Sequence, residues 1–176
     1  MADGFDLLEL GEGGLYFDEP CLPEVEALIA QAANHCGQEA AEPCLLRACF
    51  LAPEQLSVLV ALYRYYFYQH RLADALIVAE RALDVTARRL QLVGGWSSIG
   101  RVALGEAVMR SMGLLRFHLL ALKGSAVILL RLERLDEARL RLAKIAEVDA
   151  RDVLGVAPLL ALVVARQEQV AEEVSP

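Results

Sequence analysis

The chain has 176 residues, enough for one domain with a sizeable core, and 56% of them are apolar, with a mean hydropathy of +0.39. Its formal net charge of −7 at pH 7 argues against nucleic acid as the main partner. Alanine, leucine and arginine dominate, proline is scarce, and the alternation of β-branched residues typical of strands is absent. The predicted fold class is therefore all-α.

Residues 1–21 form a predicted acidic amino-terminal arm. Positions 1–46 hold ten acidic side chains and no lysine or arginine, whereas the remainder holds 14 acidic and 17 basic side chains and so carries +3. Gly11, Gly13 and Gly14 break any long helix in the arm. Its isolated apolar residues suit docking on the body of the protein or on a second subunit, so a homodimer is one expected state.

We expect a soluble, cytoplasmic protein with reduced cysteines. The chain does not open with a basic stretch followed by an apolar one, so no signal peptide is predicted. The longest uncharged and mostly apolar run extends only from Val153 to Ala165. A spanning helix needs about 20 residues, so no membrane span is predicted.

Two helices are predicted near Pro23–Asn34 and Ala40–Leu51, with a turn at Cys36-Gly37. A helix, a tight turn and a second helix follow within residues 60–85. In that second helix Ala75, Ala79 and Ala82 fall on one face at i, i+4 and i+7. Small side chains on one face allow two helices to approach closely.

Residues 60–85 resemble the bulk of one tetratricopeptide repeat (TPR). Ala75 stands where the family's pattern has the small residue at the helix crossing, and Tyr66, Ala79 and Ala82 stand at other signature positions. Further copies of this pattern occur in the chain when it is compared with itself at steps of about 34 residues, the family's repeat length. The resemblance implies an all-α TPR solenoid with repeats at 22–55, 56–89 and 119–152.

The copies are placed by their small residues. Stepping back one repeat length from Ala75 and Ala82 gives Ala41 and Ala48, and Pro53 takes the family's closing position. In the third copy Ala138 holds the crossing position, and Leu135-Asp136-Glu137-Ala138 matches Leu72-Ala73-Asp74-Ala75. The step from Ala75 to Ala138 is much longer than one repeat, so residues 90–118 are interpreted as an insertion before the third repeat.

The insertion and the carboxyl-terminal segment are predicted separately. Gly94-Gly95 should stop the preceding helix, and Trp96-Ser97-Ser98 begins a loop. From Gly105 the pattern is helical again and is expected to run unbroken into the third repeat. Residues 153–176 are a predicted capping helix and tail, since a repeat stack needs a cap at its end. Four residues should continue the core stripe there: Val156, Leu159, Leu160 and Val163.

Family geometry implies a concave groove lined by the first helix of each repeat. In the second repeat Leu59, Leu62, Tyr63 and Tyr66 should face the core, yet the neighbouring stripe is also apolar or aromatic, whereas a helix that only covered a core would be polar there. The alternative is that the arm or the insertion permanently covers this stripe. The predicted partner-binding groove consists of Val60, Arg64, Phe67, Tyr68, Lys123, Val127 and Arg131.

The groove should accept a protein or peptide partner. TPR modules that clamp the carboxylate of chaperone tails use lysine and asparagine, but the corresponding positions here hold Glu26, Ala30, Val60 and Arg64. An amphipathic helix or an extended apolar peptide fits better. The acidic arm is such a peptide, and we expect it to occupy the groove until a partner displaces it.

No cofactor, metal site or catalytic residue is predicted. Cys21, Cys36, Cys44 and Cys49 have spacings of 15, 8 and 5, which lack any CxxC pair, and they are interpreted as inert structural residues. His35, His70 and His118 fall in turns or in the insertion. No serine or cysteine has a nucleophile's spacing and no glycine-rich phosphate loop is present, so we expect no enzyme.

The predicted function is a non-catalytic interaction scaffold, an adaptor or assembly factor. Two alternatives remain open. Small, acidic, three-repeat TPR chaperones of type III secretion resemble this chain in size, charge and plan. The segments ALYRYYFYQHRLADALIVAERAL and FHLLALKGSAVILLRL resemble small TPR proteins that accompany bacterial nitrogen-fixation genes.

Overall fold

A computed structural model of the chain describes residues 19–34 and 40–174, the last four by their backbone alone. Within these residues there are eight α-helices, one short 3-10 helix and no strand, so the all-α prediction is confirmed. The described residues divide between Val85 and Thr86 into two compact units, and each is described by itself. The boundary falls inside the predicted second repeat, and a single domain over 22–152 stays a prediction.

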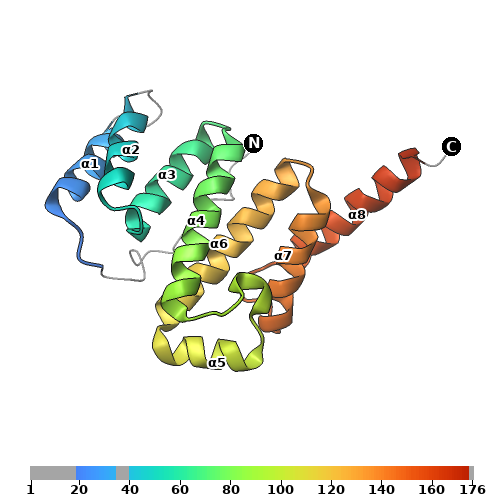
Figure 1. The fold of residues 1–176 in the computed structure, drawn as a ribbon. Helices are drawn as coiled ribbons and strands as arrows, with labels where there is room; N and C mark the ends of the chain where they lie inside the picture. Colours follow the sequence, from blue (N-terminus) through green and yellow to red (C-terminus); the bar gives the residue numbers. More distant parts are fainter. Residues whose placement is uncertain (1–18, 35–39, 175–176) are drawn as a thin grey trace. The chain divides into compact units, whose positions relative to one another are not determined.

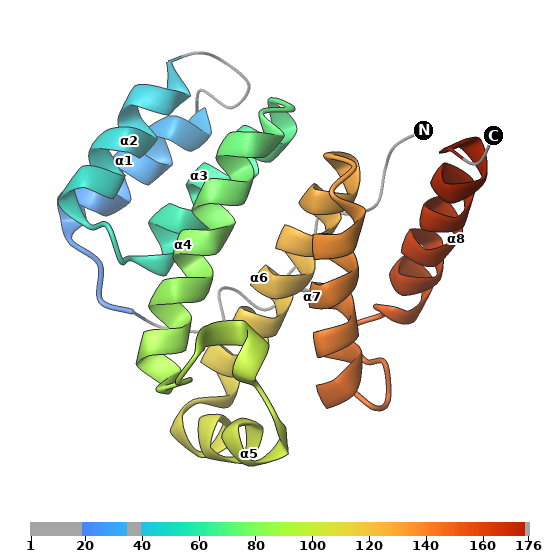
Figure 2. The ribbon, with the colours of Figure 1, turned by 45° about the vertical axis from the view of Figure 1, so that its right-hand side comes forward.

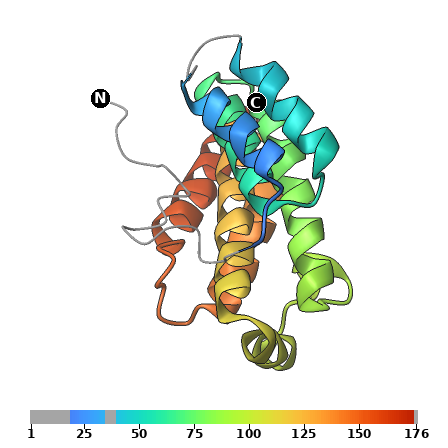
Figure 3. The same cartoon turned by 90° about the vertical axis from the view of Figure 1, so that its left-hand side faces the viewer.

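The amino-terminal unit contains α1 (Pro23–Asn34), α2 (Ala41–Leu51), α3 (Leu56–Tyr68) and the first part of α4 (Leu72–Leu90). Helices α1 and α2 lie side by side, as Figure 3 shows in blue and cyan. The bounds predicted for α1 are confirmed, and α2 begins one residue later than predicted. Their buried residues recur at helical spacing and form the contact: Val25, Leu28, Ala32, Ala41, Leu45 and Ala48.

The crossing face of α4 is buried as predicted. Ala75 is fully buried, and Ala79 and Ala82 are nearly so. In the third predicted repeat Ala138 is likewise fully buried. A buried alanine in a close helix contact leaves no room for a larger side chain, so these positions constrain the packing of their helices.

The carboxyl-terminal unit contains the end of α4, η1 (Gly95–Ser98), α5 (Arg101–Arg110), α6 (Met112–Arg131), α7 (Leu135–Val148) and α8 (Ala157–Val174). Helix α7 packs against both α6 and α8, as Figure 2 shows. Helix α5 lies across the amino-terminal end of α6 (Figure 1). Six of the largest fully buried side chains of this unit lie on α6 and α7 and form the core between them: Phe117, Leu122, Ile128, Leu129, Leu142 and Ile145.

The expectation of one unbroken helix from Gly105 into the third repeat is wrong. Helix α5 already begins at Arg101 and ends at Arg110, and the backbone of Ser111 is extended, with φ −164° and ψ 107°. The Ser111 hydroxyl oxygen accepts a hydrogen bond from the Leu114 amide at 3.2 Å. Ser111 therefore caps the amino terminus of α6 and breaks the helix there.

The turns after α3 and α6 are built identically. The amide of Arg71 donates to the carbonyl of Tyr66, and the amide of Arg134 donates to the carbonyl of Leu129, both at 2.9 Å. His70 and Glu133, one residue before each arginine, both have φ of +57°. The end of α4 closes in the same way, with Gln91 at φ +55° and the Leu92 amide donating to the carbonyl of Ala87 at 2.8 Å, so this turn is a general helix C-terminal motif that the two hairpins share.

The boundaries after α4 and before α8 differ from those predicted. Helix α4 ends at Leu90, and Gln91, with φ of +55°, turns the chain before Gly94 is reached. Helix α8 begins at Ala157 rather than near Val153, because the Asp152 carboxylate accepts hydrogen bonds from the Val156 and Ala157 amides at 2.6 and 3.1 Å. Of the predicted core stripe of this segment, Val156 and Val163 are buried and Leu159 and Leu160 are half-buried.

Helix α6 is long and apolar enough to cross a membrane by length and composition alone, the one such helix in the described part of the chain. About 61% of its most apolar window is buried inside the protein. The core helix of a globular protein has the same property, because its neighbours cover it on several sides. The absence of a membrane span stays a prediction.

Candidate protein-interaction site

Helix α3 has the two faces that the sequence predicts. The core face is confirmed: Leu59, Leu62, Tyr63 and Tyr66 are all buried. In the neighbouring stripe Val60 is also buried, whereas Arg64 is exposed and Phe67 is half-buried. The part of the stripe that solvent reaches therefore consists of Arg64, Phe67 and Tyr68.

The rings of this stripe continue from the core to the surface. The Tyr63 and Phe67 rings stack with their centroids 5.9 Å apart and an interplanar angle of 17°. The Phe67 and Tyr68 rings meet edge to face, with centroids 5.8 Å apart. Tyr68 at the end of the array is 54% exposed. Aromatic contacts of this kind hold each ring in place, so Tyr68 presents a positioned apolar surface.

The three groove residues predicted on α6 lie in the other unit and are described separately. Val127 is half-buried and Arg131 is exposed. Lys123 is half-buried, and its ammonium donates to the carbonyl of Leu154 at 2.6 Å, in the connection between α7 and α8. Burial lowers the pKa of Lys123. This lysine therefore holds that connection, and one groove combining the α3 and α6 residues stays a prediction.

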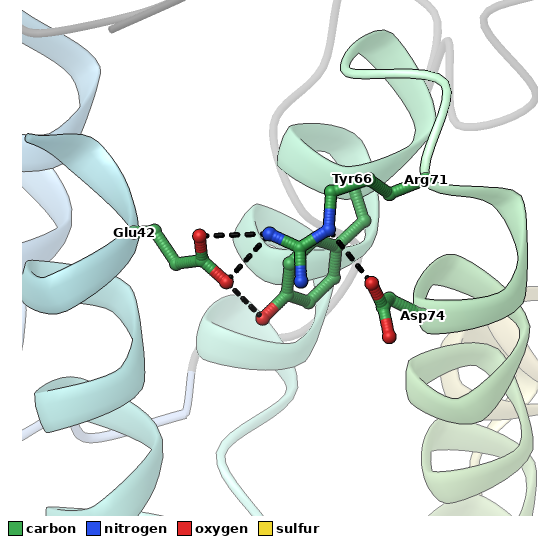
Figure 4. Close-up of polar contacts among 4 residues, drawn as sticks. All are labelled: Glu42, Tyr66, Arg71 and Asp74. Carbon is green, nitrogen blue, oxygen red and sulfur yellow. Dashed lines mark hydrogen bonds and ion pairs between the residues drawn. The ribbon is translucent and has the colours of Figure 1, made fainter. Parts of the chain in front are cut away.

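A polar cluster joins α2 to the α3–α4 hairpin (Figure 4). The Arg71 Nη1 atom lies 2.7 Å from both carboxylate oxygens of Glu42, and the Arg71 Nε atom lies 2.7 Å from the Asp74 Oδ2 atom. The Tyr66 hydroxyl donates to the same Glu42 carboxylate at 3.1 Å, and the Arg71 guanidinium lies 4.5 Å from the centroid of the Tyr66 ring. Three helices and one turn are thus tied through one arginine.

The cluster keeps the Tyr66 phenol and the Arg71 guanidinium protonated at neutral pH. Burial, followed by the hydrogen bond to Glu42, raises the pKa of Tyr66 to about 12, so the phenol stays protonated. Hydrogen bonds to Glu42 and Asp74 raise the pKa of Arg71. Both oxygens of the Glu42 carboxylate are already paired, which leaves it unsuited to act as a catalytic base. The arrangement supports a structural role.

A second polar contact lies in the core of the carboxyl-terminal unit. His118 is fully buried, and its Nδ1 atom lies 2.6 Å from the Thr86 hydroxyl oxygen. Its Nε2 atom has no hydrogen-bond partner among the described residues. Burial lowers the pKa of His118 to about 4, so the ring is neutral at neutral pH. A neutral ring with no exposed edge is part of the packing.

The sequence did not predict the partner of Arg71 in the polar cluster or the partner of His118 in the core. Arg71 and Asp74 stand at i and i+3 on one helix start, a spacing that predicts an ion pair. Glu42 is 29 residues away from Arg71, and Thr86 is 32 residues away from His118, so no local pattern could find them. The buried Arg141, whose guanidinium lies 5.3 Å from the centroid of the Trp96 ring, was missed for the same reason.

No group of three metal-binding side chains occurs within residues 19–34 and 40–174. Cys21, Cys44 and Cys49 are half-buried free thiols, and burial raises the pKa of Cys49. A raised pKa disfavours the thiolate, which is the form that binds metals and attacks substrates. Cys36 and His35 lie outside the described residues, so the prediction that this cysteine set binds no metal stays a prediction.

Comparison with known proteins finds a similar chain along nearly its whole length. It is a protein of Azotobacter chroococcum mcd 1 described as an uncharacterized 19.8 kDa protein in the nifW 5′ region. The two are 45% identical over 155 residues, which cover 88% of this chain and 86% of the relative. No protein-family model matches the chain. No solved structure matches it.

Proposed function

Since the chain belongs to the same family as the 19.8 kDa protein of the nifW 5′ region of Azotobacter chroococcum, we propose that it is a protein-binding accessory factor of nitrogen fixation. The proposal combines the genomic position of the relative with the aromatic surface of α3. It makes the protein a non-catalytic scaffold, an adaptor or assembly factor, that works by holding a partner.

The repeated hairpin supports a TPR-like plan for this scaffold. The α3–α4 and α6–α7 hairpins share their turn hydrogen bonds and their left-handed residue at equivalent positions. Each also starts its second helix with an ion pair at the same positions, Arg71–Asp74 and Arg134–Glu137. Helical-hairpin repeats of this kind bind partners on extended surfaces, which agrees with a scaffold function.

The observation that carries the proposal is the exposed end of the α3 ring array. Phe67 and Tyr68 are held by ring contacts but are not enclosed by the core, and Arg64 lies one turn before Tyr68 on the same helix. Large aromatic residues and arginine are the types that contribute most to protein interfaces. This surface fits an apolar helix or extended segment with acidic residues that pair with Arg64.

Affinity capture tests this proposal. The full chain carrying a tag is expressed in its native host, and captured proteins are compared between growth on dinitrogen and growth on ammonium. We expect a specific partner under nitrogen-fixing conditions. The double change Phe67→Ala and Tyr68→Ala should weaken its binding by ~2 kcal/mol or more, about 30-fold in the dissociation constant.

Ile77→Ala is the matched control, because Ile77 is an exposed apolar residue on α4 of the same unit. It should leave capture unchanged. Circular dichroism of the double variant shows whether the fold is intact. Equal capture by the double variant and the parent protein would place the binding surface elsewhere, and unfolding of the double variant would show that these rings belong to the core.

A further inference from the structure

The inserted segment between α4 and α6 is a compact piece with a core of its own. Its buried residues and the ends of the adjoining helices pack as one cluster: Ala87, Leu90, Leu92, Ile99, Ala107 and Leu115. The half-buried Trp96 packs against this cluster. The Arg110 guanidinium donates to the carbonyl of Leu90 at 3.3 Å, which fastens the end of α5 to the end of α4. The segment is therefore a fixed surface of the protein.

The outer side of this piece carries exposed apolar side chains. In α5 the residues Ala103, Leu104, Ala107 and Val108 pack inward. Three large apolar side chains point to solvent instead: Val102 is 78% exposed, Met109 is 86% exposed and Met112, at the start of α6, is 59% exposed. Val102 and Met109 stand at i and i+7, on one face of the helix. Exposed apolar side chains gathered on one face mark a binding surface more often than scattered ones do.

Arginines accompany each of these side chains. Arg101 adjoins Val102, Arg110 adjoins Met109, and Arg116 follows Met112 by one helical turn, and all three arginines are exposed. We call these six residues the α5 face. Residues 86–118 hold five arginines and one acidic residue, Glu106, a net charge of +4. Because the whole chain carries −7, the other residues sum to −11, so the α5 face is cationic within an acidic protein.

We propose that the α5 face binds residues 1–18 of the same chain. Those residues hold five acidic side chains and no lysine or arginine, so their charge of −5 complements the arginines. Besides Met1, they hold seven large apolar side chains that match the exposed valine and methionines: Phe5, Leu7, Leu8, Leu10, Leu15, Tyr16 and Phe17. Met side chains adapt to varied apolar partners, which suits such a contact.

The distribution of charge favours the α5 face over α3 as the binding surface. It also favours residues 1–18 over a nucleic acid or an anionic membrane as the bound partner. On α3 the accessible stripe has one arginine, Arg64, whereas the α5 face has three, of which Arg110 lies 3.7 Å from the Glu106 carboxylate. A nucleic acid or an anionic membrane would meet the cationic face but would repel a chain of −7, including the acidic segment tethered to it. An acidic segment of the chain itself avoids that repulsion and covers an exposed apolar surface.

Energy transfer from Trp96 tests the contact in the full chain. Trp96 is the only tryptophan and lies in the inserted piece. Labelling near pH 7 directs an acceptor dye to the terminal amine, whose pKa of about 8 lies below the usual pKa of lysine, about 10.4. We expect efficient transfer in the folded chain. Transfer should fall toward that of the urea-unfolded chain at about 1 M salt, where charges more than about 3 Å apart are screened.

Charge changes on both partners sharpen the test. The pair Arg101→Glu and Arg116→Glu should cause the same loss of transfer, and so should the set Asp3→Asn, Asp6→Asn and Glu9→Gln. The second set changes only the segment outside the described residues, so it remains informative where the arginine pair impairs folding. In the matched control, Arg64→Glu on α3, transfer should stay at the wild-type level.

Four results would overturn the proposal. The first is energy transfer from Trp96 in the wild type that is no higher than in the unfolded chain. The second is energy transfer that neither set of charge changes alters. The third is transfer that Arg64→Glu removes, since this places the segment on α3. Acceptor-labelled Trp96→Phe chains mixed with unlabelled wild-type chains identify contact between copies, and transfer in that mixture equal to the wild-type value would also overturn binding within one chain.

Discussion

Acid should destabilise the carboxyl-terminal unit through His118. The ring is fully buried, its Nδ1 atom is paired with Thr86, and its Nε2 atom faces no acceptor among the described residues. A second proton would place a positive charge in the core with no acceptor at Nε2 to share it, which burial disfavours. The pKa of His118 is therefore lowered from 6.5 to about 4 in the folded protein.

The size of the effect follows from the two pKa values. The unfolded chain takes up a proton near pH 6.5 and the folded one only near pH 4, so the free energy of unfolding falls as the pH drops through this window. The contribution of His118 is fully present above pH 6.5. The loss is about 2 kcal/mol near pH 5 and about 3 kcal/mol near pH 4. For a chain of this length 2 kcal/mol corresponds to about 4–8 °C in melting temperature.

The assay is urea unfolding at neutral pH and near pH 5, followed by the fluorescence of Trp96, which lies in the same unit as His118. Carboxylates also titrate near pH 5, so the informative quantity is the difference in pH dependence between the wild type and His118→Asn. His70→Asn is the control, since His70 is exposed in the turn after α3. Equal pH dependence in wild type and His118→Asn, or a magnetic resonance titration of the His118 ring near its ordinary pKa, would refute the reasoning.

Two further predictions concern packing and the polar cluster. Ala75→Leu or Ala138→Leu should lower the free energy of unfolding by ~1–3 kcal/mol, because both alanines are fully buried. The control Ala73→Leu, on the exposed side of α4, should change it little. An unaltered melting temperature in the first two variants would mean that the repeat register is wrong. The pKa of Tyr66 is raised from 10 to about 12, so the stability that its protonated phenol contributes is lost as the pH rises through that range. In urea unfolding, Tyr66→Phe should therefore lose less stability than the wild type between about pH 10 and pH 12. Identical losses of stability in the two proteins over this range would contradict the contact of Tyr66 with Glu42.

Much of the helical plan could be predicted because it depends on local patterns. The helix Pro23–Asn34 and the buried faces of α3 and α4 follow from apolar or small residues at helical spacing. The equivalence of Ala75 and Ala138, read from matching tetrapeptides, agrees with the identical turns that precede them. The break at Ser111 also had a local signal, a serine before an apolar run, but no glutamate stands three residues later to complete the usual capping box.

The candidate site could be predicted only where it depends on one helix. The two faces of α3 were visible in its sequence, and its ring contacts join residues within one or four positions of each other. Glu42 reaches Arg71, and Lys123 reaches Leu154, across separations of 29 and 31 residues, which depend on how helices pack. Val60 illustrates the limit within one helix, because it belongs to the predicted groove stripe by register but is buried by its neighbours.

The hairpin construction has a consequence for synthesis on the ribosome. The turns after α3 and α6 close with backbone hydrogen bonds over no more than five residues, and helix pairs adjacent in sequence, such as α1 with α2 and α6 with α7, pack against each other. Contacts between near neighbours in sequence form quickly, since little chain entropy is lost in closing them. Each hairpin can therefore bury its apolar face soon after its second helix leaves the exit tunnel. A chain with 56% apolar residues thus limits the time for which its nascent segments expose adhesive surface.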